Sequence, residues 1–304
     1  MMLFLEQMLN GLQFGVMLFL LAAGLTLIFG IMGVINLAHG SIYMIGAYAG
    51  TYVAAETNSF FLGVPAALAA AAIAGVAIEF LVVRRLYKRD HLDQVLATFA
   101  IIMIANQTIT LLFGRQPLFV SMPPLLDGSL EILPGLFYPV YRLAIIFVGL
   151  MVALGLYLLI NKTRVGMLVR AGSTNRDMVR ALGVDVRLLY TAVFGLGALL
   201  AGLAGFMAGP IMAVQVGMGE QILITTFVVV VIGGVGSIRG AFFASLLLGL
   251  VDTMLRAYLP PLLRQVMEGA EADALGAGIS SMGIYLLMAI VLLIRPKGLF
   301  YANN

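Results

Sequence analysis

No arginine or lysine occurs before Arg84, so residues 1–83 form a long and predominantly apolar opening stretch. Of the 304 residues, 62% are hydrophobic and 10% are charged, which is more apolar side chain than a soluble core could hide. The apolar runs of about 20 residues are long enough to span the hydrocarbon of a bilayer. In lipid, only helices and closed barrels satisfy their backbone groups, and the period-2 alternation typical of barrels is absent. The sequence therefore predicts an all-α polytopic membrane protein.

Nine apolar segments are expected to cross or enter the membrane, some of them as half-spans. They lie near residues 8–30, 41–56, 61–83, 93–113, 141–160, 189–209, 221–233, 239–258 and 281–294. We expect about 8–9 transmembrane helices, some of them broken, in a single domain that covers residues 1–304. We also consider an inverted repeat that relates the two halves.

Lysine and arginine concentrate in three connections, at residues 84–89, 161–187 and 295–297, which hold 12 of the 17 such residues. The positive-inside rule assigns these connections to the cytoplasm. The connections 114–140 and 259–280 contain prolines and acidic residues and are expected outside.

The side of the N-terminus depends on the first two segments. If 8–30 and 41–56 both cross fully, the N-terminus lies outside, and if one is re-entrant it lies inside. Because the N-terminus has no basic region, we do not expect a cleaved signal peptide.

The basic connection 161–187 is predicted to contain a short capped helix. Thr174 or Asn175 can serve as its N-cap, Asp177 lies in its first turn, and Gly183 is a stop signal. The predicted docking surface consists of Arg176, Met178, Val179, Arg180 and Leu182, where apolar side chains alternate with arginines. A free helix this short is barely stable, so its order favours a docking partner. The alternative is a solvated basic loop that satisfies only the positive-inside rule.

Two glycine-rich interruptions break otherwise apolar segments. The first contains Gly33, Asn36, His39 and Gly40, and the second contains Gly233, Gly234, Gly236 and Arg239. Irregular backbone at membrane depth is tolerated only beside protein or water, so two such breaks in corresponding halves indicate a transport pathway. The alternative is tight helix packing.

Individual polar residues in these interruptions have two interpretations each. Asn36 and His39 could contact a zwitterionic substrate or simply hydrogen-bond the glycine-rich backbone. Arg239 could line the pathway or sit at an interface, since a cation near membrane depth needs water or a partner.

Four other features predict contacts within or between spans. Glu79 is expected to pair with Arg84, and Asp252 with Arg256 four residues later on one helix near the outer surface. Asn106 is expected to bridge helices. The glycines between Gly195 and Gly209 leave one face of the sixth segment nearly free of side chains, which permits close approach of another helix.

The sequence GLTLIFGIMGVINLAHGS, from Gly24 to Ser41, resembles the signature of the permeases of branched-chain amino acid ATP-binding cassette (ABC) importers, specifically the shorter H-type. The segments Thr163–Gly166, Gly233–Gly240 and Arg295–Phe300 are similar to further motifs of that family. Permeases for urea and short amides are similar in all these motifs, so the substrate stays open.

This resemblance implies a transport subunit of the bacterial inner membrane, not an enzyme. Its partners would be a periplasmic binding protein, a second permease in a heterodimer, and two cytoplasmic ATPase subunits that bind the ATP. The chain itself would need no cofactor, and no G-x-x-x-x-G-K-[ST] phosphate loop occurs in it. Residues 174–183 would be the coupling helix, with Met178 and Leu182 as apolar anchors in an ATPase groove.

Other function classes are less consistent with the sequence. An ion-coupled secondary transporter or a channel driven by a gradient should hold carboxylates near the midplane, whereas the acids here cluster at span ends and in loops. A non-transporting scaffold would have little reason for two broken segments. His39 and His91 are far apart, cysteine is absent, and the net charge of +3 follows from the cytoplasmic loops, so neither catalysis nor metal or nucleic-acid binding is indicated.

Overall fold

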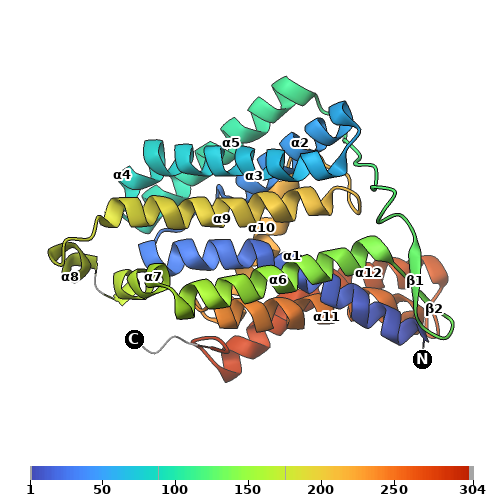
Figure 1. Ribbon diagram of the computed structural model, residues 1–304. Coiled ribbons are helices and arrows are strands. Elements are labelled where there is room, and N and C mark those ends of the chain that lie inside the picture. The colour runs from blue at the N-terminus through green and yellow to red at the C-terminus, as the bar shows by residue number, and fades with distance from the viewer. Residues whose placement is uncertain (1, 88, 175, 301–304) are drawn as a thin grey trace.

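The computed structural model describes residues 2–87, 89–174 and 176–300 (Figure 1). Most of this part is helical. The helices are α1 (Met2–Met32), α2 (His39–Thr57), α3 (Phe60–Ile78), α4 (Arg84–Leu86), α5 (His91–Phe113), α6 (Val140–Lys162), α7 (Arg164–Thr174), α8 (Arg176–Ala181), α9 (Val186–Ala208), α10 (Met218–Gly233), α11 (Ile238–Leu263) and α12 (Gly269–Ile294). A π-helical segment, η1 (Glu79–Val83), joins α3 to α4.

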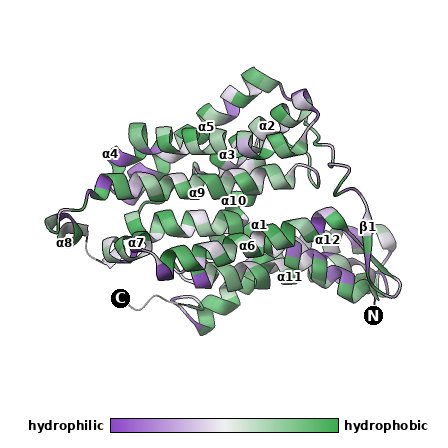
Figure 2. Ribbon diagram, viewed as in Figure 1, coloured by the Kyte–Doolittle hydropathy of each residue, from purple (hydrophilic) through white to green (hydrophobic). Residues whose placement is uncertain are grey.

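Each of the nine predicted segments corresponds to a helix, which confirms the all-α membrane class. Within the described residues, seven helices are long and apolar enough to cross a membrane, counting α3 to α4 as one. α2 and α10 are outside this set, and α10 has only 16 residues. Figure 2 shows hydrophobic residues around the helices and hydrophilic residues near α4 and α7.

Two connections differ from the expectation. The predicted outer connection 259–280 is mostly helix, since only residues 264–268 separate α11 from α12. An ion pair between Arg264 Nη2 and Asp273 Oδ2, at 2.7 Å, closes this turn. The connection between α5 and α6 contains a two-stranded antiparallel sheet, β1 (Ser129–Leu133) and β2 (Leu136–Pro139), which the sequence analysis did not predict.

The helices form two layers (Figure 1), with α2, α3, α5 and α9 in one and α1, α6, α11 and α12 in the other. α1 is the central element, because it packs against α6, α9, α10 and α11. From Val16 to Ile28 every residue of α1 is buried. This position explains why α1 is hydrophobic around its whole circumference.

Glycines bring the central helices into backbone contact. A Cβ atom on Gly24 of α1 would lie 2.8 Å from the carbonyl oxygen of Gly197 on α9, and one on Gly249 of α11 would lie 2.5 Å from that of Gly11. Gly46 of α2 likewise abuts Gly202 of α9. The side-chain-poor face of the sixth predicted span therefore packs against α1 and α2 of this same chain.

The two membrane sides follow from these contacts. The N-terminal part of α1 lies beside the α5–α6 connection, where Tyr138 donates a hydrogen bond to Asn10. The opposite end of the bundle holds the basic connections around Arg84 and Arg187. The positive-inside rule then predicts that the N-terminus lies outside.

Candidate translocation and coupling sites

The two predicted interruptions lie side by side. A Cβ atom on Gly30, near the end of α1, would lie 2.7 Å from Cα of Gly236, which follows α10. Gly33 and Gly236 have φ values of 65° and 81°, in the left-handed region that favours glycine. α11 runs antiparallel to both α1 and α10, so α1 and α10 point in the same direction. The first interruption follows α1 and the second follows α10. This shared direction does not test the inverted repeat, which concerns the two whole halves of the chain.

The first interruption, residues 33–38, is held by side-chain amides. Asn36 is fully buried, and its Oδ1 accepts a hydrogen bond of 3.1 Å from the backbone N–H of Ala38. Gln94 of α5 accepts a bond of 3.1 Å from the N–H of Ile35 and donates to the carbonyls of Leu86 and Arg89. No local sequence pattern indicates this role of Gln94, because its partners lie on other elements.

Several buried polar groups lie on the helices that flank this segment, with Thr26 on α1 and His39 and Ser41 on α2. His39 is fully buried, as are the hydroxyl groups of Thr26 and Ser41. The Nδ2 of Asn36 and those two hydroxyls find no hydrogen-bond partner in the described part of the chain, whereas the His39 ring lies beside the backbone of Leu21 without a well-aligned bond. Buried polar groups without partners are costly in an apolar interior, so this cluster favours contact with a polar species.

Glycines make room for this cluster. A Cβ atom on Gly24 would lie 3.0 Å from Nε2 of His39, and Gly40 abuts the backbone of Gly219 at the crossing of α2 and α10. Both glycines are therefore required for space, whereas Gly33 is required for its backbone conformation.

The second interruption, residues 234–237, is closed by backbone and capping bonds. Ser237 caps α11, since its Oγ accepts a bond of 3.0 Å from the N–H of Gly240. Gly233 packs against Gly240, and Gly234 has a φ of 96°. The tail covers this turn, because the N–H groups of Leu299 and Phe300 donate to the carbonyls of Ile232 and Gly233.

Arg239 is separate from the buried cluster. Its guanidinium is exposed and lies over the ring of Tyr157 on α6, at 5.6 Å from the ring centroid. Asn36 and His39 are therefore both fully buried, whereas Arg239 lines a groove beside α6.

The predicted coupling helix is α8, at Arg176–Ala181. Gly183, with a φ of 85°, ends it, and its N–H donates to the carbonyl of Arg180. Thr174 is not its N-cap, because this residue ends α7 and its hydroxyl bonds the carbonyl of Arg170. Asn175 lies outside the described residues, as do the side chains of Arg176 and Asp177.

The side chains of α8 divide into two groups. Met178 is 59% exposed, Leu182 is 76% exposed, and Arg180 is also exposed. Val179 is only 4% exposed and belongs to the hydrophobic core. Its predicted role as a docking side chain is therefore wrong, because Val179 anchors α8 to its own chain.

A buried carboxylate lies near the start of α9. Glu79 in η1 is fully buried and accepts four hydrogen bonds, two from Arg84 at 3.0 and 3.1 Å, one from Tyr87 at 2.6 Å and one from Thr191 at 2.9 Å. Burial and the bond to Glu79 raise the pKa of the Tyr87 phenol, so this group remains a donor. The predicted pair of Glu79 with Arg84 is confirmed and extends to α9.

Two further predicted contacts are confirmed. Arg256 Nε and Asp252 Oδ2 are 2.9 Å apart, and the carboxylate of this pair is buried within α11. Asn106 of α5 donates a bond of 2.5 Å to Glu220 of α10. No group of metal-ligating side chains occurs among the residues that the structure describes.

Comparison with known proteins identifies the family. Residues 7–271 match the model of the branched-chain amino acid transport system permease component. The permease protein BraD of a high-affinity branched-chain amino acid transport system from Pseudomonas aeruginosa is 31% identical, over 97% of this chain and 95% of BraD. The high-affinity branched-chain amino acid permease LivH of Escherichia coli is 27% identical over 97% of this chain and 95% of LivH. A probable LivH of Methanocaldococcus jannaschii is 28% identical over 93% of this chain and 88% of that protein. No solved structure matches the chain. The chain therefore belongs to the permease-component family of branched-chain amino acid transport systems, as a multi-pass inner-membrane transport subunit rather than an enzyme.

Proposed function

We propose that this chain carries branched-chain amino acids through the membrane as one of two different permeases of an ABC importer. Membership of the family supports the substrate class, and the names of the relatives specify branched-chain amino acids. The observation that carries the mechanism is the backbone contact of Gly30 with Gly236, which joins both interruptions at one place in the bundle.

The route for the amino acid runs beside these two interruptions and is completed by the second permease. The buried polar groups of Thr26, Asn36, His39 and Ser41 support this assignment, because they can bond a zwitterion that has left water. Such contacts need only be weak and transient, so that the substrate is released on the cytoplasmic side.

The energy comes from two ATPase subunits, which bind the ATP and dock on α8. Exposed Met178 and Leu182 support this docking, since large apolar side chains on a short basic helix suit a groove with acidic rim groups. Exposed Arg180 contacts that rim. A periplasmic binding protein delivers the substrate to the outer face.

Vesicles that contain the whole assembly test this function. Leucine uptake should require internal ATP, survive collapse of the proton gradient and be inhibited by excess isoleucine and valine. Excess urea and acetamide are the matched competitors, and inhibition by these instead would assign the substrate to the amide class. Uptake by this chain alone, driven by an ion gradient, would contradict the ABC assignment.

A further inference from the structure

A groove of about 810 Å³ lies between α6 and α11, and is bordered by α1 and α7. Leu150, Leu154 and Phe243 at its edge are exposed, so it opens on the side of the bundle and not into the buried cluster around His39. Its volume is within the range of about 300–1,000 Å³ typical of ligand sites.

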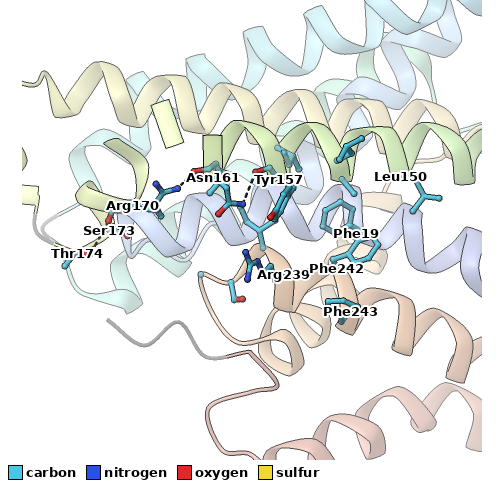
Figure 3. A pocket seen from close by; sticks show the side chains of 17 residues that line it. Phe19, Leu150, Tyr157, Asn161, Arg170, Ser173, Thr174, Arg239, Phe242 and Phe243 are labelled. Carbon is cyan, nitrogen blue, oxygen red and sulfur yellow. Dashed lines mark hydrogen bonds between the residues drawn. The ribbon is translucent and has the colours of Figure 1, made fainter. Parts of the chain in front are cut away.

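The groove has an apolar end and a polar end (Figure 3). Phe19, Phe242 and Phe243 line one end together with the leucines of α6, and Arg170 and Arg239 lie at the other. Asn161, Ser173, Thr174 and Ser237 add amide and hydroxyl groups to the polar end. This end is formed by the last turn of α6, by α7 and by the start of α11, which are all cytoplasmic.

The polar end carries uncompensated positive charge. No acidic residue lines the groove, and neither Arg170 nor Arg239 forms any ion pair found in the described part of the chain. Arg170 donates to the carbonyl of Ile160, and Arg239 stacks on Tyr157. Both interactions orient the guanidinium groups and leave their charge for an anion, because neither partner is itself charged.

We propose that this groove binds an anionic phospholipid of the cytoplasmic leaflet, with Arg170 and Arg239 at the phosphate and the phenylalanines along the acyl chains. Basic pockets between helices on the cytoplasmic side suit anionic headgroups, and the apolar end requires a ligand with a hydrocarbon part. Free phosphate can bond the two arginines, but it has no hydrocarbon part that would fill the apolar end of the groove. This site does not depend on which substrate the permease carries.

The absence of tryptophan from the sequence permits a direct test. The reporter Leu154→Trp is introduced into the groove of the assembled transporter in nanodiscs, and the fluorescence of the assembly with the unsubstituted chain is subtracted. The reporter's fluorescence is quenched by brominated phosphatidylglycerol or by brominated phosphatidylcholine at equal mole fraction. The matched control is Ile73→Trp, which replaces a side chain that is 70% exposed on α3.

We expect the anionic lipid to quench Leu154→Trp several-fold more strongly than the zwitterionic lipid, and both lipids to quench Ile73→Trp equally. Added inorganic phosphate should not reduce this preference. Arg170→Gln with Arg239→Gln should remove it, whereas Arg170→Lys with Arg239→Lys should retain most of it.

Three results would overturn the proposal. Equal quenching of Leu154→Trp by both lipids would show no headgroup selection. A preference that persists in the double glutamine variant would exclude the two arginines. A reporter that no brominated lipid quenches in the full assembly would mean that protein, such as the second permease, covers the groove.

Discussion

The hydroxyl of Thr191 on α9 donates a hydrogen bond of 2.9 Å to the carboxylate of Glu79 in the π-helical segment between α3 and α4. Arg84 bonds both residues, so one buried carboxylate ties two transmembrane helices together at their cytoplasmic ends. α9 follows α8 directly, since only the turn at residues 182–185 separates them. Force applied to α8 can therefore reach the bundle through this junction. π-helical turns are rare and occur frequently at functional sites.

We predict that Glu79→Gln loosens this junction. The amide keeps the shape but leaves Arg84 without its counter-ion, at a cost of about 1–3 kcal/mol for a poorly satisfied buried group. Thermal unfolding of the purified assembly should occur at a lower temperature, and ATP hydrolysis should respond less to substrate-loaded binding protein. Asp273→Asn is the control, because its ion pair with Arg264 is exposed and should matter little to stability. Equal stability of both variants would remove Glu79 from this role.

Met178→Asp should separate the ATPases from the permease. A charge placed in a small apolar docking site should weaken binding by about 2 kcal/mol or more, roughly 30-fold. The measurement is the amount of ATPase that co-purifies with the tagged permease, together with substrate-stimulated ATP hydrolysis. Met122→Asp makes the same change on the outer connection and should have no effect. Undiminished co-purification of the ATPases with Met178→Asp would exclude α8 as their docking site.

Gly236→Val should stop amino-acid uptake and leave the ATPases attached. Its side chain would enter the contact with Gly30, and the φ of 81° is strained for a β-branched residue at a cost of about 1–2 kcal/mol. Gly33→Val should act through backbone strain alone, since no atom lies within 4 Å of its Cβ position. Gly155→Val on α6 is the matched control, because its Cβ position is also open and its φ is not positive. Normal uptake by both Gly33→Val and Gly236→Val would mean that neither interruption needs its glycine for transport.

The sequence was sufficient to place a helix at each apolar segment, because hydrophobic length has a direct physical meaning in a bilayer, but it did not reveal the part of α12 that precedes residue 281. It was also sufficient for α8, whose stop at Gly183 is a local signal. α7 was missed within the basic connection, since Gly166 and Gly172 lower its intrinsic helix propensity and only its packing makes them acceptable.

Long-range contacts account for the remaining differences. Gln94 bonds Ile35 across 59 residues, and Glu79 bonds Thr191 across 112, so no local pattern reveals either pair. The burial of Val179 likewise depends on how α8 packs on its own chain, while its neighbours Met178 and Leu182 stay exposed. On a helix this short, helical spacing does not distinguish the side chain that packs on its own chain from those that face a partner.

We expect the buried polar cluster around the first interruption to line the substrate route, and single cysteines test this most directly because the chain has none of its own. Thr26→Cys and Ser41→Cys are small changes at buried hydroxyls, and Ala204→Cys is the control in the apolar core of α9. We predict that a water-soluble thiol reagent labels the first two in the assembled transporter, and that substrate-loaded binding protein with ATP changes their labelling rates. If both are as inert as Ala204→Cys in every state, the interruptions are packing elements and the route lies elsewhere.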